Sequence, residues 1–258
     1  MSRFANLEFD DKRAGAPKPD GAPLRNAQSF AETANEFYLA GDFEKALRDY
    51  TRALEQNSAF FEGWSGQIRM LIELGEHKEA LLWADKALEL FPENPSLFAL
   101  KSIACCRAGV LDKSMAYSDN AIAARGATPD VWLARGEILF RRRSPMAGHC
   151  VIKAIGLAEK TVPVVRLEAG RLLIRVNRYS DALSHLAQAV SVLPKAALAW
   201  YELGRCQRAL GLPAAVESFE ASLRLRPRWE KPQKALDQFN SRGLAERLKG
   251  AFRRFLGD

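Results

Sequence analysis

A spacing of 34 residues recurs along most of the chain and constrains its fold more than any other feature. Six sets of three positions, spaced four and three residues apart, follow one another at this period, and the sixth set comes one residue early. The sets are Ala46, Tyr50 and Ala53; Ala80, Ala84 and Ala87; Ser114, Ser118 and Ala121; Gly148, Ile152 and Ile155; Ala182, Leu186 and Ala189; and Ala215, Phe219 and Ser222. A period held six times predicts stacked units that bury their apolar faces against one another.

Each unit contains two segments with helical spacing and a turn between them. Most units place a large aromatic residue in the first segment at the same position, whereas Arg166 takes it in the fifth unit. The aromatic residues are Phe30, Trp64, Phe98, Trp132 and Trp200. Residues that tolerate unusual backbone angles lie at the turns, namely Gly41, Gly75, Gly109, Asn177 and Gly211. Arg143 stands at this position in the fourth unit, so we expect that unit to be distorted.

These residues resemble the tetratricopeptide repeat, a 34-residue unit with the pattern W-x2-L-G-x2-Y, then A-x3-F, then P. The sixth unit matches it best, through Trp200, Leu203, Gly204, Ala215, Phe219 and Pro227. The resemblance covers residues 27–229. It implies an all-α fold, a right-handed α-solenoid of six helix hairpins whose first helices line a concave face.

The predicted domain organisation has three parts. Residues 1–26 are rich in Gly and Pro and predict a flexible N-terminal tail, in which Phe4, Leu7 and Phe9 form either a docking motif or an inert stretch. The six repeats occupy residues 27–60, 61–94, 95–128, 129–162, 163–196 and 197–229. Residues 230–258 predict a basic amphipathic capping helix region. Its apolar stripe of Leu244, Leu248, Phe252 and Phe255 either packs on repeat six, which we favour, or binds a membrane surface or a partner.

Composition and residue pattern exclude several classes of protein. No apolar run approaches the roughly 18 residues of a membrane-spanning helix, and charged residues near the N-terminus argue against a signal peptide, so we expect a cytoplasmic protein. The four cysteines have no C-x-x-C spacing and no paired spacing with the three histidines, which argues against a disulfide framework or a metal site.

No catalytic or cofactor-binding pattern is present either. His77, His149 and His185 fall in different repeats, and no Ser, His and Asp set or Gly-rich phosphate loop accompanies them. We therefore expect a protein that is not an enzyme and that binds no cofactor.

The candidate binding residues come from the positions that the resemblance assigns to the concave face. They are Asn35, Tyr38, Arg69, Arg107, Phe140, Arg141, Arg171, Arg175, Tyr201, Arg205 and Arg208. Carboxylates alternate with arginines there, and Glu137 with Arg141, Glu168 with Arg171 and Glu202 with Arg205 have the spacing of pairs within one helix. A lining that mixes apolar, acidic and basic groups fits a peptide or helix of a partner protein, with Arg pairing its carboxylates. The chain is thus predicted to be a protein-binding scaffold or adaptor.

Two other ligands fit the sequence less well than a general protein partner does. The carboxylate clamp of tetratricopeptide co-chaperones is matched only by Asn35, because Ala31, Gly66, Ser96 and Leu100 occupy its other positions. Nucleic acid is the alternative partner, since residues 129–240 carry 18 basic and 10 acidic groups. Those basic groups lie mainly outside the concave positions and lack interleaved aromatic residues, which favours a protein partner.

Overall fold

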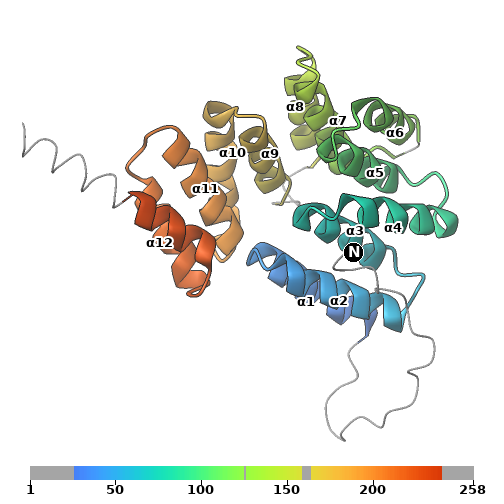
Figure 1. Ribbon diagram of the computed structural model, residues 1–258, viewed down its shortest axis with the longest axis horizontal. Coiled ribbons are helices and arrows are strands. Elements are labelled where there is room, and N and C mark those ends of the chain that lie inside the picture. Colours follow the sequence, from blue (N-terminus) through green and yellow to red (C-terminus); the bar gives the residue numbers. More distant parts are fainter. Residues whose placement is uncertain (1–25, 125, 159–163, 240–258) are drawn as a thin grey trace, which may run out of the picture. The chain divides into compact units, whose positions relative to one another are not determined.

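The computed structural model describes residues 26–124, 126–158 and 164–239, and this part of the chain is helical without strands (Figure 1). Two helices lie within each of the six ranges where the sequence places a repeat. Their bounds are α1 (Ala27–Leu39), α2 (Phe43–Gln56), α3 (Phe61–Leu74), α4 (His77–Leu90), α5 (Pro95–Arg107), α6 (Leu111–Ala123), α7 (Pro129–Arg141), α8 (Ala147–Leu157), α9 (Val164–Arg175), α10 (Tyr179–Val192), α11 (Ala197–Ala209) and α12 (Ala215–Leu225). Residues 230–239 are also helical. The fold is an all-α helical-repeat solenoid.

The turn inside every hairpin contains one residue with a positive φ. Gly41, Gly75, Gly109 and Gly211 have φ between 72° and 85°, as expected for residues without a Cβ atom. Asn177 has φ 61° and Arg143 has φ 56°, so the fourth hairpin adopts the same turn as the others. The distortion expected at Arg143 is therefore not in the turn angle, and this Arg occupies a conformation that an L side chain rarely adopts.

The close crossings within hairpins depend on small residues in the first helix. A Cβ atom on Gly204 would lie 2.7 Å from Cδ1 of Phe219, and one on Gly170 would lie 2.5 Å from Cγ of Leu186. Ala46, Ala80, Ser114, Ala182 and Ala215 on the second helices are fully buried. The side chains of one helix thus fill the space that the facing helix leaves open.

The second helix of the fourth repeat is displaced by one residue from the predicted register. Ala147, Val151 and Ala154 are buried there, whereas the side chain of Ile152 is 70% exposed. The predicted positions Gly148, Ile152 and Ile155 are therefore wrong. The cause is a shorter turn, because Ala147 follows Arg143 by four residues, just as Ala215 follows Gly211 in the sixth repeat.

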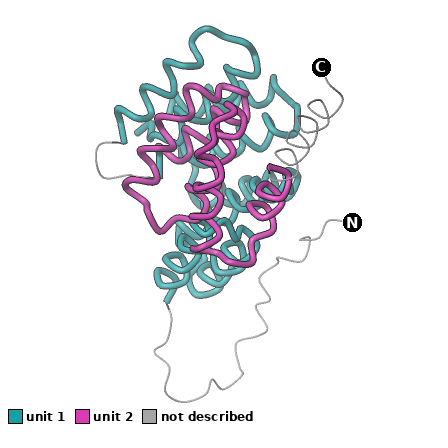
Figure 2. The backbone as a smooth tube through the Cα atoms, turned by 90° about the vertical axis from the view of Figure 1, so that its left-hand side faces the viewer, with its two compact units in different colours: residues 1–165 teal, residues 166–258 magenta. Residues whose placement is uncertain are grey.

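The chain divides into two compact units, residues 1–165 and 166–258, which Figure 2 distinguishes by colour. In unit 1, the helices of each hairpin pack together and each second helix packs on the next first helix. The first helices also contact their successors directly, α1 with α3, α3 with α5 and α5 with α7. In unit 2, α11 packs against both α10 and α12.

Residues 230–239 pack on the last hairpin of unit 2. Ala235 and Leu236 form a buried cluster with Ala215 and Phe219 of α12. The predicted N-terminal tail with Phe4, Leu7 and Phe9, and the stripe from Leu244 to Phe255, lie outside the described residues. No helix in the described ranges is both long and apolar enough to cross a membrane.

Candidate protein-binding surface

The first helices carry all of the predicted binding residues, but these side chains differ widely in exposure. Tyr38 is buried, with its ring 6.0 Å from that of Phe43, so it belongs to the interior of the first hairpin. Asn35, Arg141 and Arg208 are exposed. Partly exposed are Arg69, Phe140, Arg175, Tyr201 and Arg205. The remaining two, Arg107 and Arg171, are largely enclosed by ion pairs within their own units.

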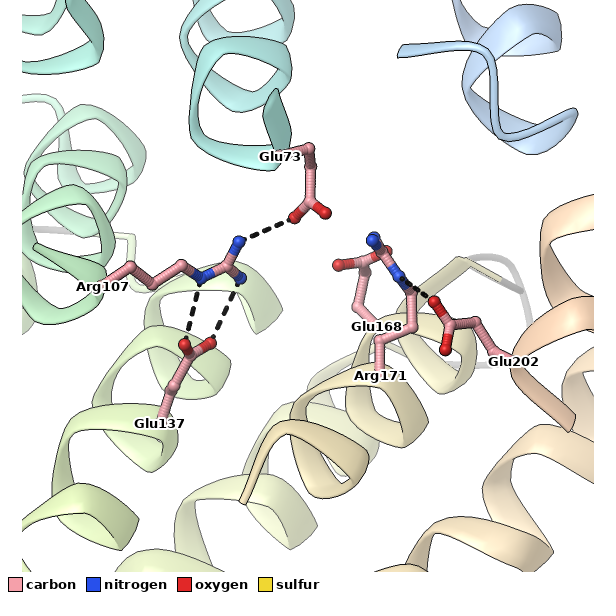
Figure 3. A network of polar contacts seen from close by, with 6 residues as sticks. All are labelled: Glu73, Arg107, Glu137, Glu168, Arg171 and Glu202. Atoms are coloured by element: carbon pink, nitrogen blue, oxygen red, sulfur yellow. Dashed lines mark hydrogen bonds and ion pairs between the residues drawn. The ribbon is translucent and has the colours of Figure 1, made fainter. Parts of the chain in front are cut away.

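In unit 1, Arg107 of α5 joins three consecutive repeats (Figure 3). Its Nη1 lies 2.9 Å from Oε1 of Glu73 on α3, and its Nε and Nη2 lie 3.1 and 3.3 Å from the two carboxylate oxygens of Glu137 on α7. Burial by itself would lower the pKa of Arg107, but the carboxylates of Glu137 and Glu73 outweigh this effect. The pKa of Arg107 is therefore raised above its usual value, and the guanidinium stays charged. Glu137 is only 1% exposed, so this bidentate pair is an internal tie between repeats.

In unit 2, Arg171 of α9 has the corresponding role. Its Nη1 lies 3.1 Å from Oε1 of Glu168, and its Nε lies 3.3 Å from Oε1 of Glu202 on α11 (Figure 3). The second oxygen of Glu202 accepts a 2.7 Å hydrogen bond from Arg205. The predicted pairs within helices, Glu168 with Arg171 and Glu202 with Arg205, are therefore confirmed. Arg171 is 5% exposed, so its side chain belongs to the interior of unit 2 and is not part of a binding surface.

A second cluster in unit 2 places an aromatic ring beside an arginine of α11, and a further arginine lies three residues later on the same helix. We call these residues, Tyr201, Arg205 and Arg208, the Tyr201 surface. The guanidinium carbon of Arg205 lies 5.8 Å from the ring centroid of Tyr201. Arg208 donates a 3.2 Å hydrogen bond to Gln238 and lies 6.0 Å from the ring of Phe219. Burial raises the pKa of Tyr201, so its hydroxyl is protonated near neutral pH.

The ring of Tyr201 also packs against the ring of Trp229. Its centroid lies 4.7 Å from that of Trp229, and Arg226 lies 5.0 Å from the Trp229 ring. Trp229 itself is 6% exposed, so it supports Tyr201 and does not offer a face to a ligand. The Tyr201 surface therefore combines a fixed, partly exposed aromatic ring with two guanidinium groups.

The position that would hold a carboxylate clamp is filled by Tyr50 of α2. Its hydroxyl donates a 2.8 Å hydrogen bond to Oδ1 of Asn35, the single residue that matches the clamp. Its ring also lies where a side chain at Gly66 would begin, because a Cβ atom there would be 2.3 Å from Cε1 of Tyr50. An asparagine at position 66 would therefore clash with Tyr50.

Burial shifts the pKa values of several cysteine and histidine side chains in the described ranges. The four cysteines are free and buried, and burial raises the pKa of Cys106 and Cys206 to about 11, so these thiols stay protonated at neutral pH. Burial has the opposite effect on the histidines, because it disfavours the charged imidazolium, and it lowers the pKa of His77 and of His185. Among the described residues, no group of three or more His, Cys, Asp or Glu is placed to hold a metal ion.

The sequence profile of the tetratricopeptide repeat matches residues 32–95 and 167–229. The chain is a tetratricopeptide repeat protein. A solved tetratricopeptide protein from Thermus thermophilus superimposes with a TM-score of 0.55 at 22% identity, over 72% of this chain and 100% of that one. The APC/C hetero-tetramer Cut9-Hcn1 gives a TM-score of 0.53 at 16% identity, over 82% of this chain and 42% of the other.

Curated relatives are plant proteins that contain similar repeats. The Hsp70-Hsp90 organizing protein of Triticum aestivum is 24% identical over 78% of this tetratricopeptide chain, which covers 35% of the relative's length. The SGT1 homolog of Oryza sativa subsp. japonica is 33% identical over 31% of the chain and 22% of its own length. This chain thus spans about a third or less of the length of these relatives.

One group of inter-repeat contacts in this tetratricopeptide array escaped the sequence analysis. Lys101 of α5 pairs with Asp85 of α4, and Arg135 of α7 pairs with Asp119 of α6. Lys101 and Arg135 are 34 residues apart, and Gln67 precedes them by the same interval. This 34-residue spacing of polar residues could have indicated the contacts between repeats. These positions are not among those that the resemblance assigns to the concave face, so they were not considered.

Proposed function

We propose that this protein is a non-catalytic adaptor that binds an acidic peptide or helix of a partner protein on the first-helix face of unit 2. The observation that carries the proposal is the Tyr201 surface, where the guanidinium of Arg205 lies against the partly exposed ring of Tyr201 and Arg208 is exposed on the same helix. Tyr and Arg are enriched at the energetic centres of protein interfaces, because one supplies rigid apolar area and the other pairs with carboxylates in a bidentate way.

Charge supports an acidic partner for this unit. Residues 166–239 carry 12 Lys and Arg against 7 Asp and Glu. Arg171 and Glu202 neutralise each other beneath the surface, whereas the outer guanidinium of Arg208 donates to the neutral amide oxygen of Gln238. Such an excess speeds the approach of an acidic segment and weakens as salt is added. A reducing compartment such as the cytoplasm fits the four free cysteines.

The name of the Triticum aestivum relative connects that protein with Hsp70 and Hsp90, but we propose a different ligand chemistry for this chain. A clamp for a terminal carboxylate would need an amide at position 66, where the ring of Tyr50 lies against Gly66. We therefore do not extend chaperone-tail binding to this protein.

The proposal is tested by capture from lysate with the full chain as bait, followed by identification of the retained proteins and binding of their acidic segments as synthetic peptides. Replacing Arg205 and Arg208 together by Ala is expected to weaken peptide binding by at least tenfold, which corresponds to about 1.4 kcal/mol. The matched control replaces Arg224 and Arg228, which are exposed arginines of the same unit outside the first-helix face. This control is expected to bind as the unaltered protein does.

Nucleic acid remains the competing ligand, and the same variants separate the two. If the Arg224 and Arg228 control lost binding and the retained material were sensitive to nuclease, the protein-binding proposal would be rejected. The burial of Trp229 argues against that outcome, because single-stranded nucleic acid needs exposed aromatic faces for stacking.

A further inference from the structure

The two arginines of the Tyr201 surface differ in whether a carboxylate already neutralises them. Nη1 of Arg205 lies 2.7 Å from Oε2 of Glu202, and Oε1 of the same carboxylate lies 3.3 Å from Nε of Arg171. Arg171 also pairs with Glu168 at 3.1 Å. Two guanidinium groups and two carboxylates balance in this network, so Arg205 places a flat guanidinium beside Tyr201 but adds no net charge to the surface.

Arg208 is held by an amide instead of a carboxylate. Its exposed side chain donates a 3.2 Å hydrogen bond from Nη1 to Oε1 of Gln238. In the part of the chain that the structure describes, no carboxylate pairs with Arg208. Burial raises the pKa of Tyr201 most strongly, and the charges of Arg205 and Arg208 both oppose that rise, so the charge of Arg208 acts at the ring. Arg208 is thus the arginine of this surface whose charge is left for a ligand.

Gln238 comes from the helix that follows the last repeat, and packing fixes where it lies. Ala235 and Leu236 of that helix are buried against α12. Gln and Glu have nearly the same shape, so a Glu at position 238 would accept the same hydrogen bond but would also neutralise Arg208. The residue type at this position therefore decides whether Arg208 can pair with a ligand.

We propose that Gln238 determines the charge specificity of the Tyr201 surface, because its amide positions the guanidinium of Arg208 without neutralising it. The surface then binds a partner segment through one carboxylate, which pairs with Arg208, and through an apolar group that packs on the ring of Tyr201. A segment dense in acidic residues would gain little more, because Glu202 already occupies Arg205. This specificity rests on the proposed peptide binding and goes further by naming the chemistry of the ligand.

The test uses an array of short synthetic peptides with amidated C-termini, each with one central Glu among varied uncharged residues, and a matched array with Gln in place of that Glu. The full chain is expected to bind its best Glu peptides at least about tenfold more tightly than their Gln counterparts. Gln238→Glu should remove this preference. Because it keeps the hydrogen bond to Arg208, its thermal unfolding midpoint should not fall.

The matched control is Gln233→Glu, which adds the same charge to an exposed residue of the same helix, roughly 140° around the helix axis from Gln238. Gln233 donates a 3.1 Å hydrogen bond to Asp237, whereas Gln238 accepts one from Arg208. The control is expected to keep the preference for Glu. A purely structural role of Gln238 predicts no loss of preference in either variant, because Gln238→Glu preserves the contact.

A third array, without acidic residues but with free C-termini, separates the two sources of a carboxylate. Binding to this array that Gln238→Glu abolishes would support the same specificity, with a chain end in place of a Glu side chain.

Three results would overturn the inference, and they separate it from the proposed function. If Gln238→Glu kept the preference for Glu, Gln238 would not set the specificity, although the surface would still bind acidic peptides. If Gln233→Glu lost the preference as well, the net charge of unit 2 and not Arg208 would select the ligand. If no Glu peptide bound the unaltered chain more tightly than its Gln counterpart, this specificity and the proposed acidic partner would both be rejected.

Discussion

At the scale of single residues, each hairpin turn has a positive φ at the same position, but Gly, Asn and Arg all occur there. Gly75, Gly109 and Gly211 have open space where a Cβ atom would stand, so backbone angle and not crowding selects Gly there. Asn177 tolerates the angle because its short polar side chain favours the left-handed region. Arg143 has neither advantage, so the fourth turn holds backbone strain that the other turns lack.

Relief of this strain gives the first prediction. Arg143→Gly is expected to stabilise the protein by about 1 kcal/mol, because an L residue in the left-handed region costs about that much relative to Gly. The reverse change at the equivalent position, Gly109→Ala, should destabilise by a similar amount without any clash. Urea unfolding monitored by circular dichroism measures both. Equal stability of the Arg143 variant and the unaltered protein would contradict the strain.

The helical glycines give a second prediction. The distance from an added Cβ atom to its nearest neighbour decides whether a Gly→Ala substitution lowers or raises the free energy of unfolding. Gly204→Ala would place a Cβ atom 2.7 Å from the fully buried ring of Phe219 and should cost about 1–3 kcal/mol. Gly136→Ala would place one 3.4 Å from Cβ of Cys150, an ordinary contact, and should be neutral or stabilise by up to about 1 kcal/mol through helix propensity. The unfolding midpoints of the two variants should therefore move in different directions, or only that of Gly204→Ala should move.

At the scale of helices, the fourth and sixth repeats share a shortened connection. Arg143, Ser144, Pro145 and Met146 precede Ala147 just as Gly211, Leu212, Pro213 and Ala214 precede Ala215. Both second helices, α8 and α12, have 11 residues. The 34-residue period runs unbroken from Arg143 to Asn177, so the residue lost in this turn is regained after α8.

A pair of identical substitutions tests this register. Val151→Asn should lower the free energy of unfolding by at least about 2 kcal/mol, because it buries an amide in an apolar site. Ile152→Asn, one residue later, should change it by less than about 0.5 kcal/mol, because that side chain is exposed. Chemical denaturation of both variants is the measurement, and the reverse order of stability would restore the register predicted from the period.

The ion pairs between helices differ in burial, and this difference predicts their energetic weight. Arg107→Ala should cost about 3–5 kcal/mol, because it leaves Glu73 and Glu137 as enclosed carboxylates without their shared cation. Arg135→Ala removes a pair whose Asp119 side chain is 59% exposed and should cost no more than about 1 kcal/mol. If thermal unfolding gave equal losses, the Arg107 network would be a surface feature and not a tie between repeats.

At the scale of the whole molecule, the period was sufficient to predict the fold but not the pairing of charges. Helix positions followed from small and aromatic residues at constant spacing, and they failed only in the second helix of repeat four, where a residue was lost and then regained. The three-residue separation of Glu168 and Arg171 on one helix did predict that pair correctly. The period did not predict Glu73 with Arg107, because contacts between first helices depend on which neighbouring faces meet.

The candidate site was less predictable than the fold for the same reason. Concave positions were assigned by their place in the repeat, which does not reveal whether a side chain is exposed. Tyr38 and Arg171 proved to be buried, whereas Tyr201, Arg205 and Arg208 form a partly exposed cluster. The support of Tyr201 by Trp229 comes from beyond the last helix of repeat six, which the repeat pattern alone does not describe.

The end of the array gives the last prediction, which separates the two parts of the C-terminal region. A chain that ends at residue 239 should keep the stability of the full protein, because Ala235 and Leu236 still cover Phe219. A chain that ends at residue 228 should unfold at a lower temperature and self-associate, because Phe219, Ala215 and Leu223 would face water. Exposing a side chain such as Phe219 costs about 1.5–3 kcal/mol. Calorimetry and light scattering of both chains measure these effects, and a loss of stability on removing residues 240–258 alone would show that this segment, and not residues 230–239, completes the fold.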